Sequence, residues 1–325
     1  MTLQRTGAWA LVVLVAIFAA APALAPNDPR RQFPGHAYAP PMRPHLLADG
    51  EFRRPFIYPV TVVNRLERRF EQDERRPVPI EFFSNGRLAS TDPSSPWLLL
   101  GGDPLGRDVF SRMLSGGRLS IGVASVAVLL ALGAGAVLGA VAGFAGGRAD
   151  RLITAIADFT IVVPMIYAVV TLRAVMPLSP EPSTIFWTMA VVMALATWAL
   201  PARGVRAIVA AERRKGYAEA AHAMGAGPLR ILLRHLLPAA AGHLAIQGFL
   251  LFPAFIFAEA TLSFVGLGFA EPSSSWGVML QDASRLSAMT EAPWLLAPAV
   301  AIVMTVLATR MLVVEGAGLA PSAKG

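Results

Sequence analysis

Long apolar segments alternate with polar ones along most of the chain. Six segments are nearly free of charge and predict the main elements: residues 7–25, 119–145, 152–176, 184–200, 239–266 and 294–314. About 20 apolar residues in a helix are enough to cross a hydrocarbon core roughly 30 Å thick. The pattern therefore predicts an all-α membrane protein with six transmembrane helices.

The first apolar segment has two interpretations. Its end, Ala23-Leu24-Ala25, is similar to the small-residue site at which a signal peptide is removed. Pro26 stands directly after that site and argues against cleavage, and the segment is long enough to span a membrane. We favour an uncleaved N-terminal anchor helix over residues 1–26.

The longest polar stretch, residues 27–115, lies between the first two apolar segments. It is dense in proline and arginine, with aromatic and β-branched residues scattered through it. Its apolar content argues against disorder, and its prolines argue against long helices. A small mixed α/β fold, a small β fold and a largely irregular loop all remain open.

A polar segment with several arginines, residues 217–238, separates the fourth and fifth apolar segments. Residues 218–224 are good helix formers, Gly225 and Gly227 interrupt that helix, and Pro228 suits the first turn of another. The sequence therefore predicts two short helices joined by a glycine-containing break.

The second short helix should be amphipathic. Its leucines fall at i, i+3, i+4 and i+7 and predict one apolar face made of Leu229, Leu232, Leu233 and Leu236. Arg230 and Arg234 lie one turn apart beside that face, and Pro238 should end the unit before the fifth apolar segment.

Two acidic residues and a glycine repeat stand out inside the apolar segments. An acid within a membrane must face protein or water, so Asp158 and Glu259 are candidates to line a transport pathway. Asp158 could equally lie near the membrane interface, and Glu259 could be neutral or hydrogen-bonded to Thr261, Ser263 or a neighbouring helix.

In the second apolar segment, glycines repeat every four residues, a spacing that allows close helix packing. They are Gly135, Gly139 and Gly143.

Composition agrees with a membrane protein and excludes several kinds of chemistry. The chain is 55% hydrophobic and 15% charged, and its net charge of +7 is accompanied by no nucleic-acid motif. The absence of cysteine excludes disulfides and thiolate metal sites. Neither lysine, Lys215 or Lys324, ends a phosphate-binding glycine loop, and no HExxH or GxSxG pattern occurs. We therefore expect no catalytic residues, cofactor or metal, and energy must come from a partner.

Basic residues in the short loops predict the topology. Residues 201–238 carry seven Lys or Arg: Arg203, Arg206, Arg213, Arg214, Lys215, Arg230 and Arg234. In contrast, Arg285 is the single basic residue between Leu267 and Pro293. Because basic short loops stay inside, residues 201–238 should be cytoplasmic, and six spans place both termini on the same side.

The polar hairpin resembles a known motif. Glu219-Ala220-Ala221, then Gly225, then Leu237-Pro238 is similar to the EAA loop of ABC importer permeases. In that family the loop is cytoplasmic and forms a coupling helix that docks on the ATPase subunit. The resemblance implies this role for Tyr217, Glu219, Ala220, Ala221, Gly225, Arg230, Arg234, Leu237 and Pro238.

Further motifs resemble those of the dipeptide, oligopeptide and nickel permeases. Residues 102–112 are similar to the G-T-D-x-L-G-R-D-x-x-S-R signature, although Gly102 replaces the threonine and Pro104 follows the aspartate. Residues 259–268 resemble the E-A-x-L-S-F-L-G-L-G block, and residues 275–277 resemble S-W-G. Shorter matches occur at residues 24–29 (A-P-x-D-P) and 146–151 (G-G-x-x-D-R).

These motifs supply the remaining candidate residues. The extracytoplasmic signature consists of Asp103, Gly106, Arg107, Asp108 and Trp276, and the candidates for a pathway or packing role are Asp158, Glu259, Ser263 and Gly266. The charges of the signature could form a local ion-paired cap at the entry to the next helix, or could contact substrate or a binding protein. Trp276 would suit the membrane interface.

The resemblance also implies an architecture and partners. It implies a type I ABC importer permease fold with an extracytoplasmic insertion at 27–115, a core at 116–315, a coupling loop at 203–238 and a cytoplasmic tail at 316–325. The protein would lie in the bacterial inner membrane with both termini cytoplasmic. It would work with a second permease subunit as a heterodimer, two cytoplasmic ATPase subunits and an extracytoplasmic solute-binding protein.

The substrate and two other classes of function remain open. Di- and oligopeptides are the expected substrates, while nickel, opines, glutathione and glycosides are alternatives. A secondary transporter should show two similar halves with matched intramembrane charges, and we find no internal repeat. A membrane anchor or signalling protein would explain the long polar stretch but not the EAA motif.

Overall fold

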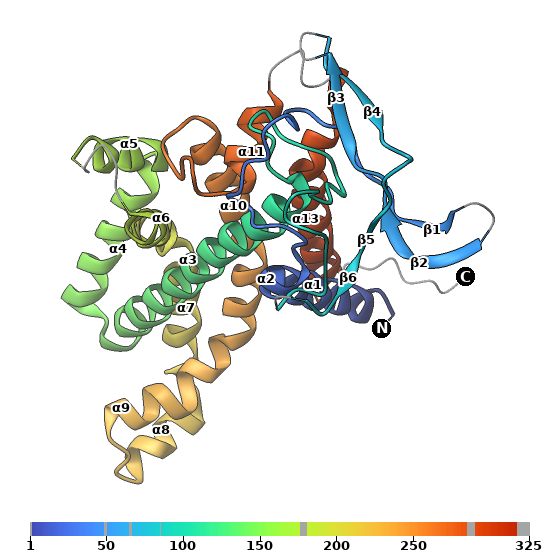
Figure 1. Cartoon of the computed structure of the whole chain (residues 1–325). Coiled ribbons are helices and arrows are strands. Elements are labelled where there is room, and N and C mark those ends of the chain that lie inside the picture. The colour runs from blue at the N-terminus through green and yellow to red at the C-terminus, as the bar shows by residue number, and fades with distance from the viewer. Residues whose placement is uncertain are drawn as a thin grey trace, which may run out of the picture. The chain divides into compact units, whose positions relative to one another are not determined.

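Helices make up most of the chain after residue 108, and the strands lie between residues 45 and 90 (Figure 1). The computed structural model describes residues 2–48, 51–64, 67–84, 86–175, 181–284 and 290–316. The chain divides into two compact units, each combining segments that are far apart in sequence. The first unit holds Met1–Ala8, Val123–Phe257 and Ala308–Gly325, and the second holds Trp9–Gly122 and Ala258–Leu307.

Three helices in the described ranges are long and apolar enough to cross a membrane. They are α3 (Val109–Ala145), the continuous stretch Pro228–Phe264, and Pro293–Leu312, which combines η3 (Pro293–Leu296) with most of α13 (Ala297–Gly316). Two bent helix pairs raise this number to five if each pair is one span. The predicted first span contains α1 (Thr2–Ala19), whose apolar part Trp9–Ala19 is shorter, and α2 (Ala21–Leu24). By length the structure supports three to five spans, and the sixth stays a prediction.

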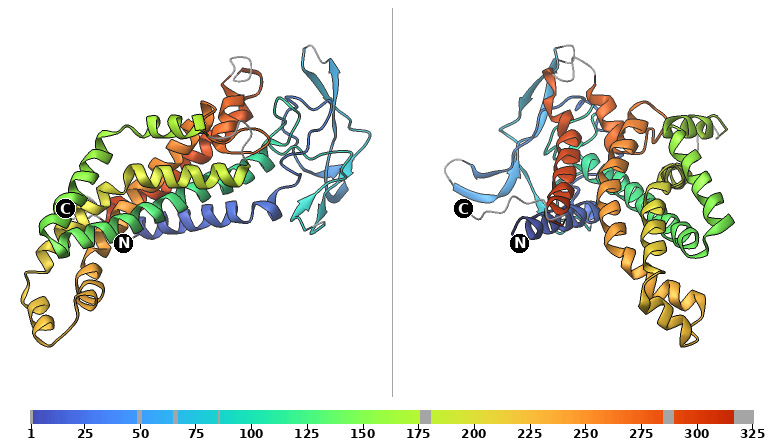
Figure 2. Two further views of the ribbon diagram at one scale, coloured as in Figure 1. Left: turned by 90° about the vertical axis from the view of Figure 1, so that its left-hand side faces the viewer. Right: turned by 180° about the vertical axis from the view of Figure 1, so that it is seen from behind.

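Prolines explain the two bends (Figure 2). The pair α4 (Gly147–Val162) and α5 (Met165–Val175) is bent by 83°. Pro164 stands at this break, where its ring and missing N–H prevent the helix from continuing. The pair α6 (Pro182–Thr197) and α7 (Ala199–Glu212) is bent by 46°, close to Pro201. The third apolar segment, residues 152–176, is therefore divided between two helices, with the break at Pro164.

A helical hairpin connects α7 to α10 (Ala241–Phe264) (Figure 1). It contains α8 (Gly216–Ala223), α9 (Pro228–Ile231), the π-helical turn η1 (Leu232–Leu236) and the 3₁₀ turn η2 (Leu237–Ala240). The helical path from α9 to α10 is continuous, so Pro238 does not end the unit as predicted. It lies in the first turn of η2, where its missing N–H is tolerated.

The long polar stretch contains short antiparallel strands. The larger sheet has the order β1 (His45–Ala48), β2 (Glu51–Ile57), β5 (Val78–Pro79). Two further pairs are β3 (Val60–Asn64) with β4 (Arg69–Gln72) and β6 (Glu81–Phe82) with β7 (Ala89–Ser90). Of the three alternatives that the sequence left open, the small β fold is the one observed.

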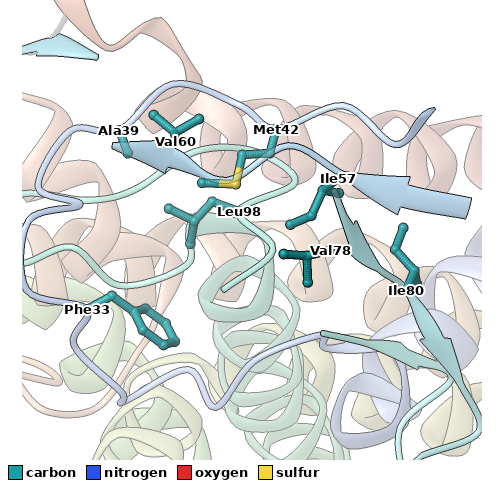
Figure 3. Packing of buried hydrophobic residues seen from close by; sticks show 8 residues of the cluster. All are labelled: Phe33, Ala39, Met42, Ile57, Val60, Val78, Ile80 and Leu98. Carbon is teal, nitrogen blue, oxygen red and sulfur yellow. The ribbon is translucent and has the colours of Figure 1, made fainter. Parts of the chain in front are cut away.

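A buried apolar cluster holds this β region together (Figure 3). It combines side chains from the strands with others from irregular segments on both sides: Phe33, Ala39, Met42, Ile57, Val60, Val78, Ile80 and Leu98. Burying one large apolar side chain contributes about 1.5–3 kcal/mol. The cluster therefore gives residues 33–98 a core of their own. The second unit also contains α11 (Trp276–Ala283), and the predicted tail lies outside the described residues from position 317 on.

Candidate functional site

The helix α8 carries most of the residues that resemble the EAA motif. Ala218 and Ala221 are buried, each 5% exposed, and pack in a cluster with Val205 and Val209 of α7. Glu219 and Ala220 are exposed on the opposite side. The alanines thus allow close packing on α7, while Glu219 and Ala220 remain available to a partner.

Gly225 ends this helix in a left-handed conformation with φ of 82°. The N–H of Ala226 donates to the carbonyl of Ala221 at 3.0 Å, which is the six-to-one hydrogen bond of a Schellman motif. A Cβ atom at Gly225 would meet nothing within 4 Å. Glycine is therefore required here by the backbone conformation and not by a lack of space.

The predicted apolar face of the following helix is wrong in part. Leu229 and Leu233 are 66% and 55% exposed, whereas Ile231 and Leu236 are buried. Residues 232–236 are π-helical, and a π-helix brings residues five apart onto one side, as Ile231 and Leu236 are. The i, i+3, i+4 pattern assumed an α-helix throughout, so it grouped the exposed Leu229 and Leu233 with the buried Leu236 and omitted Ile231.

Hydrogen bonds to Glu212 connect the start of α8 to the end of α7. The Oε1 atom of Glu212 accepts from Lys215 Nζ at 2.7 Å, and its Oε2 atom accepts from Tyr217 Oη at 2.6 Å. The hydroxyl of Tyr217, one of the candidate coupling residues, is thus anchored within the protein. Arg230, Arg234 and Pro238 are exposed, and Leu237 is half-buried.

Two ion pairs join α4 to α7. Arg206 Nη2 lies 2.6 Å from Asp150 Oδ2, and Arg203 pairs with Asp158. The side chains of this second pair are about half exposed, at 49% and 53%. Asp158 therefore lies in an inter-helix ion pair, an arrangement that the sequence did not predict.

The glycine repeat of α3 packs on the same helix α7. A Cβ atom on Gly139 would come within 2.4 Å of the carbonyl oxygen of Ala202, and one on Gly143 within 2.5 Å of that of Arg206. A Cβ atom on Gly135 would lie 2.7 Å from Cγ of Pro201. The predicted close packing is present, and its partner is a helix of the same chain.

A cavity of about 820 Å³ lies beside the hairpin. It is lined by the end of α3, the start of α4, and residues of α7, α8 and α9, including Gly143, Asp150, Arg206, Glu219 and Ile231. Movement of α8 would therefore change the space next to the α4–α7 ion pairs.

The second unit contains a network of buried charges around the LGRD signature. Asp103 Oδ2 accepts from Arg107 Nε at 2.6 Å and is also paired with Arg112. Arg107 Nη2 and Arg112 Nη2 donate to the same atom, Glu271 Oε1, at 2.9 and 2.8 Å. Asp282 completes the network with Oδ2 at 3.2 Å from Arg112 Nη1. Asp103, Arg107 and Arg112 are each at most 3% exposed.

Electrostatic effects differ among the members of this network. Burial opposes the charge of Arg107, but its hydrogen bond to Glu271 and the charge of Asp103 outweigh burial and raise its pKa. Burial likewise opposes ionisation of Glu271, but the hydrogen bond from Arg107 and the charge of Arg112 lower its pKa below the usual value. For Asp282 burial dominates and raises the pKa, with Arg112 acting in the opposite direction.

Asp108 has a different role from its neighbours in the signature. Its Oδ1 atom accepts from Phe110 N at 3.1 Å, and Oδ2 accepts from Ser111 Oγ at 2.5 Å and Asn27 Nδ2 at 3.1 Å. It thus caps α3, although complete burial, opposed by these hydrogen bonds, raises its pKa to about 6. The predicted local cap was ion-paired, whereas Asp108 caps α3 through hydrogen bonds. Asp103 and Arg107 form the local ion pair, which also joins charges from distant parts of the chain.

Sequence reasoning missed three members of the network: Arg112, Glu271 and Asp282. Arg112 lies within the recognised signature, but Glu271 and Asp282 are more than 150 positions away in the chain. The close approach at Gly106 was also unforeseen. Its φ is 73°, and a Cβ atom there would lie 2.5 Å from the carbonyl oxygen of Phe33.

Glu259 is completely buried among serine hydroxyls. Its Oε1 atom accepts from Ser263 Oγ at 2.8 Å, and Ser120 and Ser275 lie close enough to interact with the carboxyl group. Ser263 Oγ in turn accepts from Phe269 N at 3.1 Å. The Oε2 atom has no hydrogen-bond donor in favourable geometry among the described residues. These contacts match the prediction of a hydrogen-bonded Glu259.

The chain turns tightly after Ser263. Gly266, with φ of 81°, follows the end of α10, and a Cβ atom on Gly277 would lie 2.3 Å from the carbonyl oxygen of Ala260. Trp276 is fully buried, packs edge-on against Phe18 and donates from Nε1 to Met113 O at 3.1 Å. These partners enclose the side chain within the protein, and its predicted level at the membrane interface stays a prediction. Across the described ranges, no three His, Asp or Glu side chains are grouped so that they could hold a metal ion.

Comparison with known proteins gives one matching family and several similar proteins. Residues 135–314 match the family model described as "Binding-protein-dependent transport system inner membrane component". The oligopeptide transport system permease protein OppC of Bacillus subtilis is 36% identical over 213 residues, which are 65% of this chain and 67% of that protein. The glutathione transport system permease protein GsiD of Pectobacterium atrosepticum is 37% identical over 234 residues, or 71% and 74% of the two chains. The dipeptide transport system permease protein DppC of Bacillus subtilis is 38% identical over 182 residues, or 56% and 55%.

The family match covers the α3–α13 region, which includes the helical hairpin, the α4–α7 ion pairs and Glu259. The apolar helices of the structure agree with an inner-membrane component that spans the bilayer several times. The chain therefore belongs to the family of binding-protein-dependent transport system inner membrane components, as an ABC importer permease of the peptide and oligopeptide class.

Proposed function

We propose that this subunit forms half of the translocation pathway of an ATP-driven importer for di- or oligopeptides. Permeases of this family work with ATPase and binding-protein partners. We infer a heterodimer with a second permease, two cytoplasmic ATPase subunits and an extracytoplasmic solute-binding protein. Peptides are the proposed substrates because two of the relatives named above are oligopeptide and dipeptide permeases. Glutathione, itself a small peptide, is named for a third.

The proposed topology has six spans, with α1 as the first and both termini in the cytoplasm. In this arrangement residues 203–238 face the cytoplasm, and the β region with residues 27–115 lies outside. The basic residues of the hairpin support this orientation, since short cytoplasmic loops are rich in Lys and Arg. The chain lacks a phosphate-binding loop, so ATP hydrolysis is assigned to partner subunits.

The packing of α8 is the observation that supports coupling of the permease to an ATPase through the hairpin. One side of α8 is fixed to α7 by Ala218 and Ala221, and the other side exposes Glu219. A force applied to the exposed side would pass to α7 and then to α4, through the Asp150–Arg206 pair. Closure of the ATPases would in this way move several membrane helices together and switch the pathway between its two orientations.

Two neighbouring glycines provide a matched test of coupling. Gly225 has φ of 82°, which a β-branched side chain rarely adopts, whereas Gly227 has an ordinary φ of −67°, and both positions are open. We expect Gly225→Val to reduce ATP-driven peptide uptake several-fold in vesicles containing the complete transporter. Uptake by the Gly227→Val transporter should stay much closer to that of the parent.

ATP hydrolysis is measured on the same vesicles. Hydrolysis that continues while uptake falls is the expected sign of lost coupling. Undiminished uptake by the Gly225→Val transporter would contradict the proposal, provided that the ATPase subunits co-purify with it. A permease preparation that never retains an ATPase would contradict the proposed assembly itself.

A further inference from the structure

An apolar groove of about 730 Å³ lies within the second unit, apart from the charged network and Glu259. It is formed where the ends of three helices, α1, α3 and α13, meet residues of the β region. Its walls include Ile17, Phe18, Trp97, Phe110, Val300 and Met304. The lining is almost entirely hydrocarbon and aromatic, and the volume is typical of a site for a small molecule.

The groove is open on the side of the helices that form membrane spans. Val300 and Met304 of α13 are 61% and 52% exposed, and Ile17 of α1 is 38% exposed. In an inner-membrane protein such apolar side chains face lipid, because exposing them to water is unfavourable. The acyl chains of the bilayer are therefore in direct reach of the groove.

A cation lies next to residues that line the groove. Arg87 directly precedes Leu88, which lines the groove, and its Nη1 atom donates to the carbonyl of Ala25 at 3.2 Å. Ala25 itself lies between Leu24 and Pro26, two further lining residues, and the N–H of Leu88 donates to Ala23 O at 2.7 Å. Arg87 is half-buried, and no carboxylate in the described part of the chain forms an ion pair with it.

An apolar groove with an arginine beside its lining residues is complementary to one kind of membrane molecule. A phospholipid offers an acyl chain for the groove and a negative phosphate for the guanidinium group, which can bind phosphate oxygens through several N–H donors. A neutral helix of another subunit would cover the groove but would leave the charge of Arg87 without a partner. We propose that this groove binds an anionic phospholipid, with an acyl chain against Trp97 and Phe110 and the phosphate at Arg87.

Quenching of Trp97 by brominated lipid tests the proposal directly. The complete transporter is reconstituted in vesicles that contain either brominated phosphatidylglycerol or brominated phosphatidylcholine at the same mole fraction. The contribution of Trp97 is the difference in fluorescence between the parent and Trp97→Phe. We expect phosphatidylglycerol to occupy the groove about five-fold more readily, the ratio that about 1 kcal/mol of attraction per arginine near the membrane surface gives.

Two arginine variants distinguish the effect of the charge at the groove on lipid preference from the effect of the overall charge of the protein. Arg87→Gln should abolish the preference for phosphatidylglycerol and leave quenching by both lipids. Arg75→Gln removes an exposed arginine elsewhere in the β region and should keep the preference. Native mass spectrometry gives a second readout, in which the purified Arg87→Gln complex should retain fewer phosphatidylglycerol molecules than the parent.

Two results would overturn the proposal. If neither brominated lipid quenches Trp97 in the assembled transporter, a protein subunit covers the groove. If both lipids quench equally in the parent, and Arg87→Gln changes neither quenching nor lipid retention, the groove holds only ordinary boundary lipid.

Discussion

The Nη2 atom of Arg107 lies 2.9 Å from Oε1 of Glu271, although 164 positions separate the two residues in the chain. This hydrogen bond joins the turn before α3 to the segment between α10 and α11. Arg112 donates to the same carboxylate oxygen, so two buried arginines converge on one partly exposed acid. The LGRD signature is therefore part of a structural network that connects two distant segments of the second unit.

Removal of Arg112 should be strongly destabilising. Its side chain is completely buried and contacts Asp103, Glu271 and Asp282, so Arg112→Gln leaves three acids with too few positive partners. Breaking a buried ion pair in this way typically costs about 3–5 kcal/mol. A large fall in the melting temperature of the detergent-purified protein is expected.

Arg69→Gln is the control for that measurement. Arg69 pairs with Glu71 at 3.5 Å, and both side chains are more than half exposed. Exposed pairs contribute about 0–1 kcal/mol, so this variant should melt close to the parent. Equal melting temperatures for the Arg112 and Arg69 variants would show that the network does not support the fold.

The stabilising effect of Glu271 should depend on pH. Its pKa lies below the usual 4.5 because Arg107 and Arg112 favour the charged form over the opposing effect of burial. An acid whose pKa is lowered by folding stabilises the protein above its unfolded pKa, and the effect is lost as pH falls through the folded pKa. The difference in melting temperature between the parent and Glu271→Gln should therefore be largest near pH 7 and shrink as pH falls below 4.5.

Asp282, whose pKa is raised mainly by burial, is present in both proteins, so most of its opposite contribution is common to both. A difference that stays constant down to the lowest pH would mean that the carboxylate charge contributes nothing.

The glycines of α3 allow a test of helix packing within one helix. A Cβ atom at Gly139 would lie 2.4 Å from the backbone oxygen of Ala202, whereas Gly133 has open space around it. Gly139→Ala should destabilise the protein by about 1–3 kcal/mol, as other overpacked sites do. Gly133→Ala should be neutral or stabilising by about 0.5–1 kcal/mol, because alanine is the better helix former. Both values come from the same thermal-unfolding assay, and a neutral Gly139→Ala would contradict the close α3–α7 contact.

Local physical rules account for the features that the sequence predicted. The glycine repeat, the helix end at Gly225, the start of α9 at Pro228 and the apolar helices each depend on residues close together in the chain. Predictions from helix periodicity were wrong where the helix departs from 3.6 residues per turn. Residues 232–236 form a π-helical turn, and Leu229 and Leu233 of the predicted apolar face are exposed.

Long-range partners could not be predicted from one sequence. Nothing near Asp158 indicates that Arg203 is its counterion, and nothing near Arg107 indicates Glu271. These pairs follow from helix packing and chain reversal, which composition and periodicity do not describe. For Glu259 the sequence left a pathway role, a neutral carboxyl group and a hydrogen-bonded one open, and the structure shows the hydrogen bond from Ser263.

Substitutions of Glu259 can distinguish a packing role from a role in the transport pathway. No basic side chain bonds to this carboxyl group among the described residues, and Ser263 donates to its Oε1 atom. Glutamine keeps an oxygen acceptor for Ser263, so Glu259→Gln should preserve both the melting temperature and ATP-driven uptake. Glu259→Leu leaves a buried hydroxyl without its acceptor and should cost about 1–3 kcal/mol, with reduced amounts of assembled transporter. If the charge of Glu259 guided substrate instead, both variants would lose uptake while keeping parental melting temperatures, and the packing interpretation would be wrong.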